Sequence, residues 1–439
     1  MTLVRKMQQY FAVIVFMLSM NSAHAVIEIV ITRGIDGALP VAVVPFGWSD
    51  PRQAPPQDVA GIISADLTRS GRFAPIKEKD LIALPHDASQ VKFQNWRILG
   101  TEFLVVGKVG QAVANRYSVQ FQLFDVFKGE QLAGYSFQVP ANRLRRIAHH
   151  ISDLIYEKLT GQKGAFNTRI AYITTGQQGK KPRYKLKVSD SDGFNEISIL
   201  DSPSPLMSPA WAQDGNRLAY VTFEGGRSRI FIQYVNTGKR VEVTSYRGIN
   251  GAPAWSPDGR RLALTLSKDG NAEIYVLTIA SRQLRRITRN GGIDTEPAWS
   301  PDGRSLVFTS NRGGKPQIYQ VTIGPAGAAG RPKRLTFDGE YNARASISPD
   351  GKLMTFVYGN KGIYRIAVQE LATGNLTVLT DSRLDESPSF APNGSMVIYA
   401  TSLKNRGILA AVSVDGRVQQ KLAVQQGDVR EPAWSPYNR

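Results

Sequence analysis

The chain contains no cysteine and only four histidines among its 439 residues. The lack of cysteine excludes a disulfide scaffold, thiolate chemistry and a lipid anchor on an N-terminal cysteine. The histidines do not form a cluster, because His86 stands in a predicted loop and His149 and His150 are neighbours that diverge on a helix. A Gly-x-Ser-x-Gly elbow and a phosphate-binding Gly-rich loop are also missing. We therefore expect no catalytic residues, no metal and no cofactor.

Long apolar runs are absent beyond the N-terminus. A basic pair at residues 5 and 6 precedes an apolar stretch at residues 10–20, which is too short to span a bilayer. A small-x-small cleavage site ends at Ala25. The sequence therefore predicts a signal peptide at residues 1–25, removal of that peptide after Ala25, no transmembrane segment in the mature chain, and a periplasmic location.

Acidic residues are scarcer than basic ones, with 36 Asp and Glu against 54 Lys and Arg, a net charge of +18. Loss of the basic pair in the signal leaves 18 − 2 = +16. An exported protein rarely meets nucleic acid, so we expect no nucleic-acid partner. An anionic membrane surface, a cell-wall polymer or an acidic protein fits the charge. The basic side chains also fit a simpler purpose, which is to keep exposed sheet edges soluble.

One phrase recurs six times in the second half of the chain. It reads Pro-Ala-Trp-Ser-Pro-Asp-Gly at residues 253–259 and 297–303, and four weaker copies surround these two. The steps between copies are 44, 44, 48, 43 and 44 residues, measured between the central residues Trp211, Trp255, Trp299, Ile347, Phe390 and Trp434. A period of this length with strand-like content is typical of a β-propeller.

The ends of the repeat region predict the number of blades. Each of the first five phrases is followed by three strand-like runs, whereas the sixth is followed by almost nothing. Three further strand-like runs, at residues 169–173, 184–188 and 196–200, precede the first phrase. If the C-terminal strand joins these three, the ring closes with six four-stranded blades. The large ring of each phrase is expected to wedge between neighbouring blades.

A smaller domain of mixed composition precedes the propeller. Its predicted strands cover residues 41–46, 103–107, 117–124 and 132–139, and its predicted helices cover residues 58–69 and 142–159. The sequence therefore predicts a mixed fold: an α/β domain at residues 41–163, followed by a six-bladed β-propeller at residues 164–439. A β-prone arm at residues 26–40 comes first. This arm fits either strand addition to another protein's sheet or an edge strand of its own domain.

Acidic residues stand just before three of the innermost strands. They are Asp294 and Glu296, the pair Asp385 and Glu386, and Glu431. The ring is expected to bring these loops to one mouth of the axial channel. On a basic chain such a mouth could bind a cation, accept donors from a partner protein, or form a solvated rim.

The order of these parts resembles the TolB family of periplasmic Tol–Pal proteins over essentially the whole mature chain. The most particular matches are residues 250–253, Asn-Gly-Ala-Pro, and residues 432–437, Pro-Ala-Trp-Ser-Pro-Tyr. The resemblance implies a monomeric, non-catalytic scaffold that supports outer-membrane integrity and constriction during cell division. It implies a TolA-binding arm made of Val26, Ile27, Glu28, Ile29, Val30, Ile31, Thr32, Arg33, Gly34, Ile35 and Asp36.

The resemblance also implies that the propeller mouth binds the lipoprotein Pal. With the acidic loops included, the expected Pal face comprises Asn250, Gly251, Ala252, Thr295, Glu296, Glu386 and Glu431. One position departs from the family, because Ile249 stands where a histidine is common. Two other functions remain open at this point: an envelope hydrolase, or a propeller that binds a small ligand or a cell-wall polymer.

Overall fold

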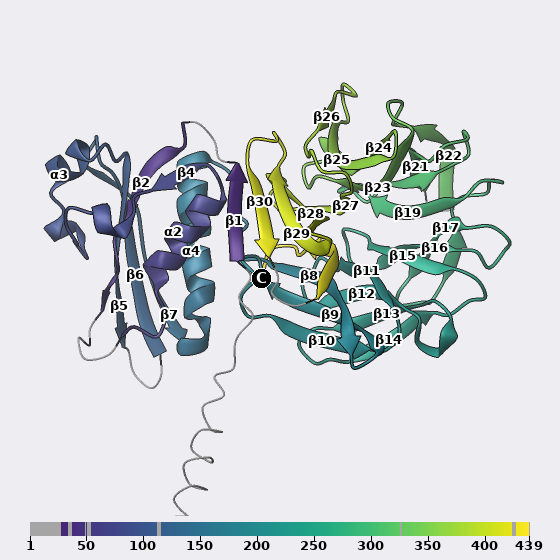
Figure 1. Cartoon of the computed structure of the whole chain (residues 1–439), viewed down its shortest axis with the longest axis horizontal. Helices are drawn as coiled ribbons and strands as arrows, with labels where there is room; N and C mark the ends of the chain where they lie inside the picture. Colours follow the sequence, from purple (N-terminus) through teal and green to yellow (C-terminus); the bar gives the residue numbers. More distant parts are fainter. Residues whose placement is uncertain are drawn as a thin grey trace, which may run out of the picture.

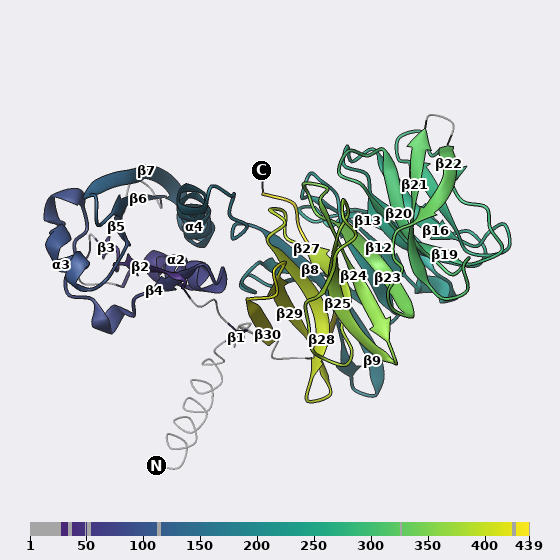
Figure 2. The same ribbon diagram turned by 90° about the horizontal axis from the view of Figure 1, so that it is seen from above.

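The computed structural model describes residues 28–33, 37–48, 50, 54–111, 116–324, 327–423 and 427–438. The predicted signal peptide and its cleavage site, together with residues 26, 27 and 34–36 of the arm, lie outside the described residues. The rest forms an α/β domain beside a β-propeller (Figures 1 and 2). Among the described residues, no helix has the length and apolar character needed to span a membrane.

The propeller has six four-stranded antiparallel blades, as the repeat predicted. The C-terminal strand β31 (Asp428–Trp434) pairs with β8 (Arg169–Gln178), which continues into β9 (Lys181–Asp190) and β10 (Ile197–Ser202). Trp434 stands opposite Ile170, and the Ser435 amide donates to the Arg169 carbonyl at 2.8 Å. The two ends of the repeat region therefore share one blade, which closes the ring.

The other five blades follow in chain order, each from its innermost to its outermost strand. They are β11 (Leu206–Trp211), β12 (Arg217–Thr222), β13 (Arg229–Tyr234) and β14 (Arg240–Thr244); β15 (Asn250–Trp255), β16 (Arg261–Leu266), β17 (Glu273–Thr278) and β18 (Leu284–Arg286); β19 (Asp294–Trp299), β20 (Ser305–Ser310), β21 (Gln317–Gly324) and β22 (Gly327–Arg334); β23 (Tyr341–Ile347), β24 (Leu353–Asn360), β25 (Ile363–Glu370) and β26 (Leu376–Val378); and β27 (Glu386–Phe390), β28 (Met396–Leu403), β29 (Arg406–Ser413) and β30 (Gln419–Ala423).

The recurring tryptophans join neighbouring blades, as expected. Trp255 Nε1 donates to the Ala210 carbonyl of the preceding blade at 3.2 Å, and Trp299 repeats the bond with Ala254. The Arg217 guanidinium of the preceding blade lies 4.6 Å from the centre of the Trp255 ring, which adds a cation–π contact. Each indole therefore packs between two sheets and satisfies its one polar group there.

The α/β domain is a sheet with helices on both faces. Its strands lie in the order β4-β2-β5-β6-β7, with β3 also paired to β5, and only the β2–β4, β2–β5 and β3–β5 pairs are parallel. The helices α2 and α4 cover one face and α3 the other. The bounds are β2 (Leu39–Val43), β3 (Gly47–Trp48), α2 (Val59–Arg69), β4 (Phe73–Pro75), α3 (Phe93–Ile98), β5 (Phe103–Gln111), β6 (Arg116–Asp125), β7 (Glu130–Pro140) and α4 (Leu144–Thr160).

Local signals account for the ends of the two long helices. Asp58 caps α2, because its Oδ1 accepts the Gly61 amide at 2.9 Å. Gly161 ends α4 in the left-handed conformation, at φ 73°. Between these ends, Leu144, Ile151 and Ile155 bury the same face of α4 in the core. This face packs against α2 and holds both helices on the sheet.

The arm strand β1 (Glu28–Arg33) lies on the propeller and not on the sheet of its own domain (Figure 1). It pairs antiparallel with β30 as a fifth strand of the last blade. Glu28 stands opposite Ala423 and Ile31 opposite Gln420. The alternative of an edge strand in its own domain is therefore wrong. The arm is an edge strand of the last propeller blade, because the outermost strand β30 offers free backbone groups that β1 can pair.

Removal of residues 432–439 is expected to lower the melting temperature of the protein. The truncation takes away the end of the strand that closes the ring, and with it Trp434, whose Nε1 donates to Thr168 at 2.9 Å. Loss of a fully buried ring costs about 3–5 kcal/mol, and Trp434 is half-buried against its cluster, so we expect a smaller cost from the ring and a further one from the lost strand pairing. Differential scanning calorimetry of the mature and truncated proteins measures the change, and an unaltered melting temperature would contradict closure by this strand.

Candidate functional site

Six residues in a rare backbone conformation surround one end of the axial channel. Each lies three positions before the central residue of its phrase, on an innermost strand, and has φ between 46° and 57°. The pairing register of every innermost strand shifts at this point, as at a β-bulge. All six line a channel cavity of about 560 Å³: Ser208, Ala252, Glu296, Arg344, Ser387 and Glu431.

Non-glycine residues adopt this conformation at a cost of about 1–3 kcal/mol each, and such strain concentrates at functional sites. In a regular strand, alternate side chains face the two neighbouring blades. The bulge interrupts this alternation and directs one side chain into the channel. The sixfold repetition therefore builds a ring of variable side chains on a constant backbone. This ring is the rim of the channel mouth.

Arg344 joins the charged members of the rim. Its Nη2 lies 3.0 Å from Glu431 Oε2, its Nε 3.4 Å from Glu296 Oε1, and its Nη1 donates to Ser387 Oγ at 2.6 Å. Glu431 Oε2 also accepts the Ser208 amide at 2.6 Å. Four blades are thus connected through one guanidinium. We call Arg344, Glu296 and Glu431 the rim clamp.

The rim clamp corrects the expectation of an acidic mouth. Burial lowers the pKa of Arg344, but the charges of Glu431 and Glu296 raise it above its usual value. The guanidinium thus balances one of the two negative charges in the rim clamp. Sequence reasoning missed Arg344 because only acidic residues before the phrases were considered. Arg344 stands in the repeat after that of Glu296, at the equivalent position.

The other predicted site residues divide into exposed and buried groups. Ala252 lines the mouth, and Gly251, Thr295 and Glu386 are half-buried beside it. Asn250 is fully buried, because its side chain bonds to both the amide and the carbonyl of Tyr246. It shapes the preceding loop and presents no side chain to a partner.

Two of the acidic residues expected at the mouth are also buried. Asp294 accepts bonds from Ser310 Oγ and Arg312 Nη2, both at 2.6 Å, and Asp385 accepts one from Thr380 Oγ1. Both carboxylates have no exposed surface. They stand at the position of Asn250 in their own repeats and hold the loops that lead into the innermost strands.

Large apolar side chains are exposed around the same mouth. They lie in the loops that lead into the innermost strands, or at the start of such a strand, and the topology brings these segments to one face. Phe337 is 71 % exposed and Ile249 51 % exposed. We call this set the apolar collar: Met207, Tyr246, Ile249, Ile293, Phe337 and Leu384. Sequence reasoning missed it, because single apolar residues in loops carry no periodic pattern.

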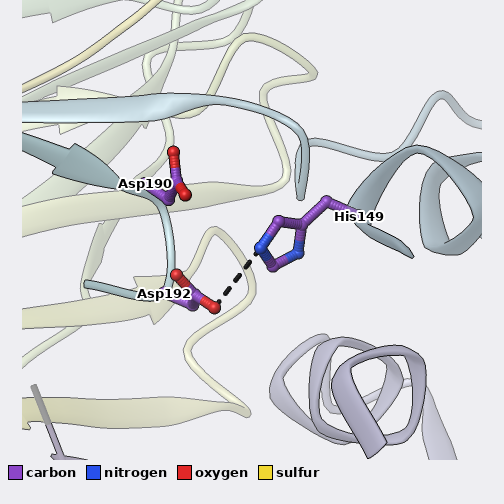
Figure 3. Close-up of side chains that lie close together, drawn as sticks. All are labelled: His149, Asp190 and Asp192. Carbon is purple, nitrogen blue, oxygen red and sulfur yellow. Dashed lines mark ion pairs between the residues drawn. The ribbon is translucent and has the colours of Figure 1, made fainter. Parts of the chain in front are cut away.

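A second cluster of titratable groups lies where the two domains meet. It consists of His149 of α4, Asp190 at the end of β9 and Asp192 just after it (Figure 3). Each offers one possible metal-ligand atom, and these atoms lie within 4.8 Å of one another. The oxygens are already engaged, however: Arg145 Nη2 bonds Asp192 Oδ2, and Asn195 Nδ2 donates to Asp190 Oδ2 at 2.6 Å. The geometry favours an ion-pair network over a metal centre.

Two family models match the chain and together cover most of it. The "TolB amino-terminal domain" matches residues 27–132, and the "TolB beta propeller domain" matches residues 156–438. The chain is 58 % identical over 427 residues to the Tol-Pal system protein TolB of Nitrosococcus oceani, and 53 % identical over 425 residues to that of Thioalkalivibrio sulfidiphilus. Each alignment covers 97 % of both chains.

A solved structure agrees with these relatives. The crystal structure of TolB from Acinetobacter baumannii is 41 % identical to this chain, with a TM-score of 0.85. The match covers 93 % of this chain and all of the other. Sequence and fold lead to the same result, and the chain belongs to the TolB family.

Proposed function

We propose that this protein is a non-catalytic, monomeric scaffold of the Tol–Pal system in the periplasm. It binds the lipoprotein Pal at the channel mouth and TolA through its N-terminal arm, and so supports outer-membrane integrity and constriction during cell division. One observation carries the proposal: the apolar collar and the strained rim lie together at one mouth of the channel. Exposed apolar groups around a hollow are characteristic of a protein-binding surface.

The rim clamp defines the polar part of the Pal site. A partner loop that enters the mouth loses water on all sides, so its polar groups need partners within the rim. Arg344 offers hydrogen-bond donors, whereas Glu431 and Glu386 offer acceptors. Bonds to charged groups of this kind are the strong ones. The collar supplies apolar area around this polar centre. Most specific interfaces have the opposite arrangement, with an apolar centre and a polar edge.

The arm supports the second binding surface. Its strand β1 already pairs through its backbone with β30, which is the type of contact that strand addition to another protein uses. A strand has two edges, and each backbone hydrogen bond contributes about 1 kcal/mol. TolA can therefore bind the arm on its second edge, or replace β30 as the pairing strand.

The substitution Ala252→Arg is expected to weaken Pal binding at least tenfold. Ala252 has φ 46° on the rim, close to the 55° at which Arg344 is held in an equivalent position, so the backbone accepts arginine. The new side chain fills the mouth and adds a positive charge. Isothermal titration calorimetry measures the affinity, and tenfold corresponds to about 1.4 kcal/mol.

Two further variants define the site. Glu296→Ala should weaken Pal binding in the same direction, because it frees Arg344 from one side of the rim clamp. Lys239→Ala is the control: Lys239 is exposed in the turn between β13 and β14, at the opposite end of the blade. Arg286 is unsuitable as a control, since its Nη2 bonds the buried Glu273 at 3.0 Å. Normal Pal affinity in both rim variants, with a loss in Lys239→Ala, would contradict the proposal.

Deletion of Val26 to Asp36 is expected to abolish TolA binding and to leave Pal binding unchanged or stronger. Stronger Pal binding would show that docking of the arm on β30 is coupled to the mouth. Calorimetry with each partner on the same preparation measures both, and the Pal titration confirms that the shortened protein is folded. Full TolA affinity without the arm would overturn this assignment.

A further inference from the structure

The contact between the two domains contains a buried histidine that lies between two carboxylates. Figure 3 shows the contact with the propeller carboxylate, Asp192. His149 of α4 is 2 % exposed. Its Nδ1 lies 2.7 Å from Asp66 Oδ2, on α2 of the same domain, and its Nε2 lies 3.3 Å from Asp192 Oδ2, in the loop after β9 of the propeller. One imidazole thus contacts both domains.

Each of the two carboxylates also has an arginine. Arg69 bonds Asp66 and donates through Nη1 to the Ser191 carbonyl of the propeller at 3.3 Å. Arg145 bonds Asp192 and lies 3.5 Å from the centre of the Phe194 ring. Both arginines therefore cross from the α/β domain to the same propeller loop. The histidine stands between these two ion pairs.

The two nitrogens of His149 both face carboxylate oxygens. A neutral imidazole has one N–H group, so its other nitrogen would direct a lone pair at a carboxylate, whereas an imidazolium donates to both. The buried Nε2 forms no hydrogen bond, so its 3.3 Å approach to Asp192 Oδ2 is favourable as a contact between opposite charges. A proton on His149 is therefore the state that satisfies both carboxylates.

We propose that the imidazolium of His149 is a latch that holds the α/β domain in a fixed orientation against the first blade of the propeller. Removing the proton takes away the cation that the two buried carboxylates share, and each keeps only its arginine, so the junction loses stability. The contact of the α/β domain with the first blade then rests on the Arg69 and Arg145 contacts and on the pairing of β1 with β30. This inference is independent of the partners proposed above.

Several charged groups face the latch from every element around it. They are Asp66 and Arg69 of α2, Arg145, Arg146 and Asp153 of α4, Asp190 at the end of β9, Asp192 after it, and Arg169 of β8. Burial lowers the pKa of His149, but Asp66 and Asp192 raise it to about 9. Burial raises the pKa of Asp153 to about 7. Two groups therefore titrate at or above neutral pH, and a test must separate them.

The sign of the pH dependence follows from these shifts. Because the pKa of His149 is raised, its stabilisation is complete below the ordinary value of 6.5 and is lost as the pH rises towards about 9. Burial raises the pKa of Asp66, but the charge of His149 lowers it below its usual value of 3.8. The latch also opens in acid, when Asp66 and Asp192 take up protons.

Nuclear magnetic resonance of the histidine rings tests the protonation directly. The mature chain has three histidines, His86, His149 and His150, and single His→Gln variants assign their signals. We expect the His149 ring to stay doubly protonated at pH 7.5 and to titrate near pH 9. A ring that is neutral at pH 7.5 would overturn the proposal. A His149 signal that moves on addition of zinc alone at neutral pH would do the same, because it would assign the site to a metal.

Paired variants test the effect on the domains. His149→Gln should raise the radius of gyration in small-angle X-ray scattering at pH 7, and wild type should reach the same value only above about pH 9. His150→Gln is the matched control: the adjacent ring packs on Phe137 within its own domain, so no change is expected. Asp192→Asn, on the propeller side, should act like His149→Gln, and the double variant should add little.

A second measurement separates a change in domain orientation from a loss of folding. The near-ultraviolet circular dichroism spectrum of His149→Gln should equal that of wild type, while its radius of gyration differs. If wild type and His149→Gln scatter identically at pH 7 and at pH 9.5, the histidine does not set the orientation. If His150→Gln changes the scattering as much as His149→Gln, the effect belongs to α4 as a whole and the latch is wrong.

Discussion

Closure of the ring by β31 is the constraint on which the rest of the structure depends. Residues 428–434 pair with 170–175, across more than half of the chain, and this pairing turns a row of repeats into a ring. The tryptophans of the first three phrases then bond to the blade before their own. Trp211 Nε1 donates to the Ala433 carbonyl across the closure, and Trp255 and Trp299 donate to Ala210 and Ala254. A closed ring leaves only short, protected sheet edges.

Closure also builds the candidate site. Since the six bulges fall at one level of the ring, residues from 208 to 431 in the sequence become neighbours around one mouth. The rim clamp depends on this arrangement, because Arg344 lies 48 residues after Glu296 and 87 before Glu431. The apolar collar depends on it as well, because the loops that carry it meet only when the blades are arranged around an axis. The site is therefore a property of the ring and not of any one repeat.

The sequence predicted those features that repeat, and missed those that vary between repeats. The period of the phrase and the unpaired strands at its ends predicted six blades, and the apolar periodicity of residues 58–69 and 142–159 predicted both long helices of the α/β domain. The repeat predicted that the acidic loops meet at one mouth of the channel, but it did not predict Arg344 or the apolar collar there. Arg344 and Asn250 occupy repeated positions with changing residues. The partners of Arg344 come from other blades and follow from the ring geometry, whereas Asn250 bonds Tyr246 in the loop just before it. His149 was set aside for a sound local reason, since it diverges from His150, yet its partners come from α2 and from another domain.

The central claim is that the mouth with the rim clamp and the apolar collar is the face that meets Pal. Hydrogen–deuterium exchange of the whole mature protein, with and without Pal, tests it most directly, because every loop is observed in one experiment. We expect slower exchange in residues 245–252, 289–296, 335–344 and 380–387, around the mouth. We expect no change in the Asp-Gly turns at residues 213–216, 257–260 and 301–304, at the other end of the channel. Protection confined to those turns, with the mouth unchanged, would show that Pal binds elsewhere on the propeller.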